Sequence, residues 1–146
     1  MNKELIDDIN SLVLNEKVVF VSSANAEGYP NTKAMFNLQR DGLTTHYFST
    51  NLSSKRTQQF MVNSKSCIYF CNQAEFKGLM LIGKMEVMTD RKHREMLWAE
   101  GNEIYYPDGI DDTDYVVLKF TAESGNYYYG LSNCTFKIDE LVTPTA

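Results

Sequence analysis

Apolar residues recur at every third or fourth position near the start of the chain. Between residues 3 and 15 these positions are Leu5, Ile6, Ile9, Leu12 and Val13. The spacing matches the 3.6-residue period of an α-helix and gathers the apolar side chains into one stripe. We therefore predict an amphipathic helix over residues 3–15 that packs against the rest of the protein.

The next segments are rich in β-branched and aromatic residues and are separated by turn-forming residues. Such segments are typical of strands joined by short connections. Turns are expected at residues 25–28 and at Asp41-Gly42. The strands predicted around these turns cover residues 18–24, 32–38 and 43–50. The first half of the chain is thus predicted to be a β-meander behind one helix.

Helical and extended patterns alternate in the second half. Ser53 or Ser54 is a predicted N-cap of a helix that ends near Val62, and Asp90 caps another helix that ends near Trp98. Further strands are predicted at residues 67–71, 79–88, 115–121 and 127–129.

Two glycines interrupt this part of the chain. We expect Gly83 to mark a bulge or bend in a long strand and Ser124-Gly125 to form a turn. Six or seven antiparallel strands with about three helices predict a mainly β (α+β) fold. The architecture expected is a β-barrel or curled sheet with the helices packed outside.

Composition and charge narrow the class of protein. The 146 residues are 43% hydrophobic and 23% charged, which predicts a single globular domain over residues 1–146. Fourteen basic and nineteen acidic side chains give a net charge of −5, and no stripe of Lys or Arg is present. Binding to nucleic acid or to an anionic membrane is therefore not expected.

Cysteine usage and the apolar runs point to the cytoplasm. No run approaches the about 18 apolar residues that a membrane span needs, and no signal-peptide pattern occurs near the start. Cys67 and Cys71 would lie about 13 Å apart on one strand, too far for a disulfide. We predict reduced cysteines in the core. Neither His46 nor His93 has ligands at metal-binding spacing, so no metal site is expected.

The segment from Phe48 to Arg56 runs from a strand end into the first turn of a helix. Unpaired amides and the helix dipole make that end positive. Without a bound anion, the positive charges of Lys55 and Arg56 each destabilise the helix start by ~0.3 to 1 kcal/mol. A phosphate group would neutralise them, with Ser54 donating a hydroxyl hydrogen bond. A capping serine followed by two solvated cations fits the spacing equally well.

Other residues have two interpretations as well. Lys33, on a neighbouring predicted strand, either directs a further cation to the same place or faces solvent. Aromatic residues either line a pocket for a planar ligand or fill the core or a dimer interface; they are Trp98, Tyr105, Tyr106, Tyr127, Tyr128 and Tyr129. No arrangement of nucleophile, base and acid is apparent, so no catalytic side chain is predicted.

Four separated segments, taken in order, resemble one known family. They are Gly28-x-Pro30-Asn31-x-Lys33-Ala34-Met35, Phe48-Ser49-Thr50-Asn51-Leu52-Ser53-Ser54-Lys55-Arg56, Leu81-Ile82-Gly83-Lys84-Met85-Glu86-Val87 and Tyr106-Pro107-Asp108-Gly109-Ile110-Asp111-Asp112-Thr113-Asp114-Tyr115. Residues 18 to about 130 resemble the pyridoxamine 5′-phosphate oxidase-like FMN-binding split-barrel superfamily, and most of all its small general stress protein branch. The resemblance implies a split-barrel homodimer that holds FMN in grooves between the subunits.

By position, the resemblance assigns contacts to the flavin ring. Lys33 matches the family's basic residue on the second strand, and the backbone of Ala34, Met35 and Phe36 would border the isoalloxazine ring. Tyr128 matches an aromatic residue of the second subunit that closes the groove.

The resemblance also assigns contacts at a strand end and a helix start. Ser49 and Thr50 match a pair of residues at a strand end that contacts the cofactor. Ser54, Lys55 and Arg56 match the serine and two basic residues that hold the phosphate of FMN.

Some positions depart from the family pattern. Where pyridoxamine phosphate oxidases hold the substrate phosphate, this chain has Leu38 or Gln39, Met96, Glu100 and about Ile104. Pyridoxamine 5′-phosphate oxidation is therefore not expected.

Two further departures concern the flavin. Gly78 stands in place of a glutamine that reaches it, and residues 133–146 lack the arginine-rich C-terminal motif, so FMN affinity is expected to be reduced. The resulting hypothesis is a flavin-dependent oxidoreductase of unknown substrate. The alternatives are a non-catalytic dimeric module that sequesters FMN or a related phosphorylated ligand, and a split barrel that binds a deazaflavin or haem. Haem would need His46 or His93 as its axial ligand.

Overall fold

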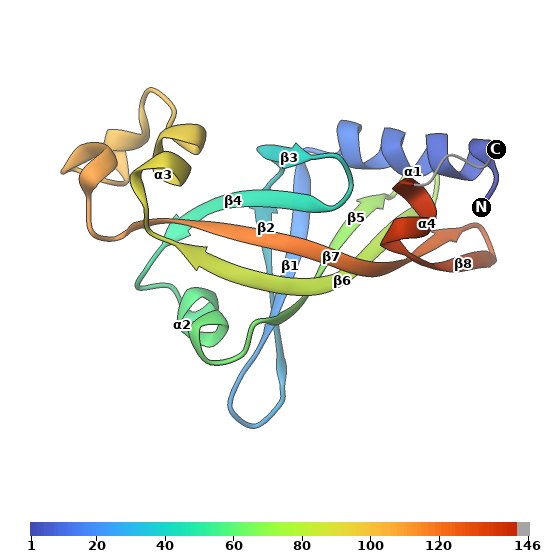
Figure 1. Ribbon diagram of the computed structural model, residues 1–146, viewed down its shortest axis with the longest axis horizontal. Helices are drawn as coiled ribbons and strands as arrows, with labels where there is room; N and C mark the ends of the chain where they lie inside the picture. Colours follow the sequence, from blue (N-terminus) through green and yellow to red (C-terminus); the bar gives the residue numbers. More distant parts are fainter. Residues whose placement is uncertain (143–146) are drawn as a thin grey trace.

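One antiparallel sheet and its covering helices make up the computed structural model, which describes residues 1–142 (Figure 1). The helices are α1 (Lys3–Asn15), α2 (Lys55–Val62), α3 (Arg91–Leu97) and α4 (Ile138–Val142). The strands are β1 (Val18–Ala24), β2 (Pro30–Phe36), β3 (Gln39–Asp41), β4 (Thr45–Asn51), β5 (Lys65–Asn72), β6 (Lys77–Met88), β7 (Tyr115–Tyr129) and β8 (Ser132–Lys137). Short 3₁₀ turns, Asn102–Ile104 and Gly109–Asp111, lie between α3 and β7. Figure 1 shows α3 at one end of the molecule and α1 with α4 at the other.

Strand β7 organises the sheet, whose order is β2-β1-β5-β6-β7-β4-β3. One side of β7 pairs with β6. The other side pairs with β4 along Tyr115 to Thr121 and with β8 along Ser124 to Tyr129. Because β7 spans 15 residues, it carries two neighbours end to end on the same side.

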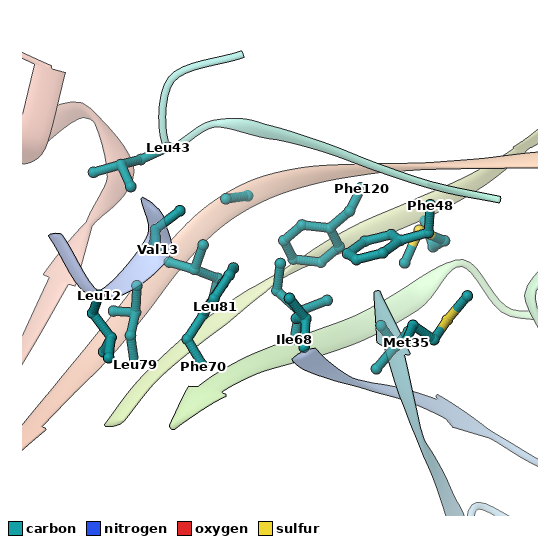
Figure 2. Close-up of a cluster of buried hydrophobic side chains, with 14 of the residues drawn as sticks. Leu12, Val13, Met35, Leu43, Phe48, Ile68, Phe70, Leu79, Leu81 and Phe120 are labelled. Carbon is teal, nitrogen blue, oxygen red and sulfur yellow. The ribbon is translucent and has the colours of Figure 1, made fainter. Parts of the chain in front are cut away.

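The core lies inside the curl of the sheet. In strand β1 successive side chains alternate between the two faces of the sheet. Val19 and Val21 are buried in the core, while Val18 and Phe20 point to the opposite side. Helix α1 adds the stripe formed by Ile9, Leu12 and Val13. Figure 2 shows Leu12 and Val13 of α1 in one cluster with side chains of the sheet, among them Phe48, Ile68 and Phe120. Burial of each large apolar side chain there stabilises the folded protein by about 1.5–3 kcal/mol.

The predicted fold class is confirmed: the protein is mainly antiparallel β with helices around the sheet. Within residues 1–142 the sheet has eight strands rather than the six or seven expected. Strands β3 and β8 were not predicted, and the strands predicted at residues 115–121 and 127–129 form one strand, β7. Helix α4 was also missed. The predicted turns after β1 and at Asp41-Gly42 are present.

The predicted turn at Ser124-Gly125 is wrong, since both residues lie within β7. Gly125 pairs with Phe136 of β8, and a Cβ built on it would lie 2.6 Å from the Phe136 ring and 2.9 Å from Leu81. The glycine therefore serves close packing rather than chain reversal.

The prediction for Gly83 is confirmed, because the pairing of β6 with β7 shifts register between Ile82 and Gly83. A Cβ on Gly83 would lie 2.0 Å from the carbonyl oxygen of Thr121. The three cysteines are free, but they are half-buried, so their expected place in the core is wrong.

Candidate functional site

Two strand edges without a hydrogen-bonded neighbour face one groove. Strand β3 pairs with Thr45 to Tyr47 only, so the end of β4 from Phe48 to Asn51 pairs on one side alone within residues 1–142. Strand β2 pairs only with β1 in the same range. A groove of about 510 Å³ lies between these edges, and residues of both line it. Alternate backbone N–H and C=O groups of both edges are left for a ligand.

The lining combines three parts of the chain. Strand β2 and the loop after it supply one wall, the end of β4 and α2 supply the base, and the segment after α3 supplies the other wall. The lining residues are Lys33, Ala34, Met35, Phe36, Leu38, Ser49, Thr50, Asn51, Arg56, Leu97, Ala99, Asn102, Tyr105 and Tyr106. Two of them are cationic and none is acidic, so the groove favours an anion at the end where Lys33 and Arg56 lie.

Arg56 is the central cation of the groove. Its guanidinium donates a hydrogen bond to the Thr50 hydroxyl, and its Nε is buried with no partner among the described residues. No carboxylate in the described part of the chain pairs with it. Burial lowers the pKa of Arg56. A half-buried charge without a counter-ion is costly, so the arrangement is suited to an anionic ligand.

Ser54 caps helix α2. Its hydroxyl accepts a hydrogen bond from the Thr57 amide at 3.2 Å and lies 2.7 Å from the Thr57 hydroxyl. The amides of Lys55 and Arg56 follow at the first two helical positions, which have no acceptor within a helix. The positive end of this helix therefore reaches the groove at Arg56, the one residue of α2 that lines it.

Asp114, just before β7, holds the loop between β4 and α2. Its carboxylate accepts hydrogen bonds from the Ser53 amide at 2.8 Å, the Ser53 hydroxyl at 3.1 Å and the Asn51 side chain at 3.1 Å. Its backbone carbonyl accepts one from the Leu52 amide at 2.8 Å. The bonds from Ser53 and Asn51 lower the pKa of Asp114. The loop is thereby fixed by a residue distant in sequence.

The second wall of the groove carries no charge; we call Leu97, Ala99, Asn102, Tyr105 and Tyr106 the uncharged wall. Tyr106 is buried and its hydroxyl donates to the Asn51 side chain at 2.9 Å. Its ring packs edge-on against Tyr115, with centroids 4.8 Å apart. Tyr105, in contrast, is 74% exposed. The ring of Tyr106 is thus held in place by its neighbours, while the ring of Tyr105 faces solvent.

The segment behind this wall is tied to helix α3 by Arg94. Its guanidinium donates to the carbonyl oxygens of Ile110 and Asp112, both at 3.2 Å. Trp98 packs edge-on against Tyr115, with ring centroids 5.2 Å apart. These contacts hold the uncharged wall against the sheet.

Most of the residues predicted for the cofactor site come together in the groove. Lys33, Ala34, Met35, Phe36, Ser49, Thr50 and Arg56 all line it. Lys55 lines a different hollow of about 480 Å³, beside the β1–β2 turn. Ser54 is engaged in the helix cap, and Tyr128 lies on β7 opposite Gly78. In a single chain, therefore, these three side chains do not line the groove.

Several groove residues were not predicted from the sequence. Leu97 is the last residue of α3, Ala99 and Asn102 follow that helix, and none of the three belongs to a motif. Asn51 and Asp114 lay inside the quoted segments, but their hydrogen bond joins positions 63 residues apart. No local signal in the sequence pointed to this bond.

Gly78 makes room for a phenol. A Cβ built on it would lie 1.9 Å from the Tyr69 hydroxyl, so the Tyr69 side chain lies across this glycine. Burial raises the pKa of Tyr69. The space that a longer side chain at position 78 would need is already occupied by this ring.

Neither histidine lines the groove. His46 is buried, its Nε2 lies 2.9 Å from the Leu43 carbonyl oxygen, and burial lowers its pKa to about 4. His93 contacts the Asp90 carboxylate at 2.8 Å. Among residues 1–142 we find no cluster of three or more His, Cys, Asp or Glu that could hold a metal ion. Over the same residues, every helix is too short or too polar to cross a membrane.

Known proteins match this sequence and this fold. The family model described as pyridoxamine 5′-phosphate oxidase matches residues 5–129. A Clostridium acetobutylicum protein described as related to general stress protein 26 of B. subtilis is 48% identical, with 97% of this chain and 99% of that chain covered and a TM-score of 0.86. No curated protein matches.

More distant structures share the fold. General stress protein 26 from Bacillus anthracis has a TM-score of 0.73 at 14% identity, over 91% of this chain and 99% of its own. HupZ of Group A Streptococcus has a TM-score of 0.68 at 17% identity, over 88% of this chain and 97% of its own. Because the family model covers most of the chain and a general stress protein relative is 48% identical, the protein belongs to the pyridoxamine 5′-phosphate oxidase family, in its general stress protein 26 branch.

Proposed function

We propose that the protein binds FMN in the groove between β2 and β4, with the phosphate at Arg56 and the start of α2. The observation that carries the proposal is the half-buried Arg56 guanidinium, whose Nε has no partner and which no described carboxylate neutralises. A phosphomonoester supplies about −1.5 to −2 charges and three acceptor oxygens, which suits this cation. Lys33 on the facing edge provides a second positive charge.

The rest of the groove suits the flavin ring. Residues 34–36 of β2 and residues 49–51 of β4 offer the backbone groups of two free strand edges. Met35 and Phe36 add apolar surface beside them. Main-chain donors and acceptors together with an apolar lining are common in sites for planar cofactors. These features support placing the ring along β2.

When bound, the flavin would supply electron transfer, and the chain would supply binding and orientation. The groove lining contains no His, Cys, Asp or Glu. The groove therefore offers no histidine, thiol or carboxylate as a general acid or base, which favours a flavin-dependent oxidoreductase without a catalytic residue of its own. The same lining fits a module that holds FMN without turnover, and that second function is tested below.

We further propose that the protein is a homodimer formed through the outer face of the sheet. Cross-strand pairing puts Ala34, Phe20, Tyr69 and Met80 in one row on that face. Phe20 is 38% exposed and Phe36 is 74% exposed. Because Ala34 and Phe36 also line the groove, a second copy on this face would border the groove as well. Tyr128, on the same face, would then approach the partner's groove.

The three free cysteines fit a reducing compartment, and we place the protein in the cytoplasm. The binding proposal is tested by titrating the purified protein with FMN and, as a matched ligand without phosphate, riboflavin. FMN should bind at least about tenfold more tightly than riboflavin, because only FMN satisfies Arg56. Equal affinities would contradict the phosphate assignment. Anaerobic bleaching of bound flavin by NADH or NADPH would favour the oxidoreductase over the binding module.

A further inference from the structure

The charges of the groove are distributed unevenly, and this limits what can bind beside FMN. Both cations, Lys33 and Arg56, belong to the side formed by β2 and α2. The phosphate of FMN carries about −1.5 to −2 charges and would use both of them. No positive charge in the lining would then remain for a second ligand.

The uncharged wall presents ring and aliphatic surface instead. Tyr105 is 74% exposed, and no described residue bonds to its hydroxyl, so its ring is free to stack on a ligand. Leu97 and Ala99 add aliphatic surface, and Asn102 is the only side-chain amide of the wall. Offset stacking on a tyrosine ring favours planar, aromatic partners.

An anionic substrate would be rejected at this wall. A carboxylate or phosphate enclosed there would lose its hydration without gaining a cation. The positions that the family resemblance relates to a substrate phosphate hold Leu38 or Gln39, Met96, Glu100 and about Ile104. Of these residues Leu38 alone lines the groove, and it carries no charge. Glu100 is acidic, so it would repel a phosphate rather than bind it.

We propose that the second ligand of the groove is an uncharged, planar ring compound, selected by the uncharged wall with Tyr105 as its stacking residue. This inference rests on the proposed function, because it concerns the molecule that shares the groove with FMN. It extends that function by naming the chemical class of the substrate. The same wall disfavours phosphorylated and carboxylated ring compounds, because it offers them no cation.

The test compares two probes that differ in charge but hardly in shape. FMN-loaded, oxidised protein is dialysed to equilibrium against 2-naphthamide, which is uncharged, or 2-naphthoate, which is anionic at neutral pH. We expect the amide to bind at least about tenfold more tightly, since the naphthoate carboxylate finds no cation. Equal affinities, or tighter binding of naphthoate, would overturn the inference.

Three variants locate the binding. Tyr105→Ala should weaken 2-naphthamide binding to the FMN-loaded protein about fivefold through the lost stacking. Tyr105→Arg should raise the affinity for 2-naphthoate about tenfold, because it supplies the missing cation. Tyr29→Ala, at a tyrosine that is 66% exposed and outside the groove, is the matched control and should change neither affinity. An unchanged amide affinity in Tyr105→Ala would contradict the role of this ring.

The result separates this inference from the proposed function. FMN affinity is measured on the same samples, and absence of FMN binding would contradict the proposed function alone. The dialysis is repeated on flavin-free protein in phosphate buffer, where inorganic phosphate neutralises Lys33 and Arg56. Tighter binding of 2-naphthamide than of 2-naphthoate to the flavin-free protein supports the inference even without FMN. Equal binding of the two probes overturns it.

Discussion

The carboxylate of Asp114 accepts a hydrogen bond of 2.8 Å from the backbone amide of Ser53, across 61 residues of sequence. This bond joins the start of β7 to the loop that leads into α2. Together with the bonds from the Ser53 hydroxyl and Asn51, it sets where helix α2 begins and therefore where Arg56 lies. The proposed phosphate site thus depends on a residue that does not line the groove.

Replacing Asp114 should therefore weaken FMN binding indirectly. We expect Asp114→Asn to lower FMN affinity about three- to tenfold, because a neutral amide holds the loop less strongly than a carboxylate does. Riboflavin affinity should fall less, since the ring contacts come from β2. Isothermal titration with both ligands measures this difference. Asp108→Asn, an exposed neighbour, should bind FMN like the parent protein; equal losses in the two variants would contradict the role of Asp114.

Arg56 and Lys55 should differ sharply, although they are adjacent. Arg56→Gln is expected to lower FMN affinity by about 10- to 100-fold, the range for losing a charge-assisted hydrogen bond. Lys55→Gln should lower FMN affinity less than about threefold. The Lys55 side chain lines the hollow beside the β1–β2 turn, so it acts on the phosphate only through a charge that solvent and salt screen. Fluorescence titration of FMN measures both. A larger loss at Lys55 would show that the phosphate lies on the other side of α2.

The pairing of β7 with β8 should depend on Gly125. A methyl group there would meet the Phe136 ring and Leu81, so Gly125→Ala is expected to reduce the free energy of unfolding by about 1–3 kcal/mol. Ser124→Ala, at the preceding and half-buried position, should change it by less than about 0.5 kcal/mol. Urea denaturation followed by circular dichroism gives both values. No loss for Gly125→Ala would mean that β8 can move away at little cost.

Stability should fall in mild acid because of His46. Its pKa in the folded protein is about 4 against an ordinary value of 6.5, so the unfolded chain binds more protons between these values. The contribution of neutral His46 is complete above pH 6.5 and is lost as the pH falls toward 4, by about 3 kcal/mol in total. Denaturation midpoints in His46→Gln should vary less with pH over this window. His93→Gln, at the half-buried histidine of α3, should retain the full dependence.

The dimer proposal makes a separate prediction. Phe20→Glu puts a charge in the row of outer-face residues, so it should convert the dimer to a monomer by sedimentation equilibrium at micromolar protein. Leu131→Glu, fully exposed at the β7–β8 turn, should leave the dimer intact. A parent protein that sediments as a monomer would contradict the proposal directly.

Local patterns were enough to predict much of the fold. The period of the apolar residues predicts α1, and the run of β-branched and aromatic residues predicts β1, whose core-facing Val19 and Val21 are buried. Caps at Ser54 and Asp90 are present as expected. These features are set by neighbours in the sequence, so the sequence alone carries them.

Features that depend on distant partners were missed. The sequence neighbours of Gly125 favour a turn. In the structure, position 125 lacks room for a side chain because the Phe136 ring packs against it. The bond from Asp114 to Ser53 and the uncharged wall likewise arise only after β7 pairs with β4. The side on which Lys55 lies was also not predictable, because it depends on the rotation of α2 against the sheet.

A crystal structure of the protein grown with FMN would show whether the phosphate binds to Arg56 in the groove between β2 and β4. We expect phosphate oxygens within hydrogen-bond distance of the Arg56 guanidinium and the flavin ring along residues 34–36. Phosphate density beside Lys55 and Gln58, or a groove without flavin in protein that binds FMN in solution, would contradict this expectation.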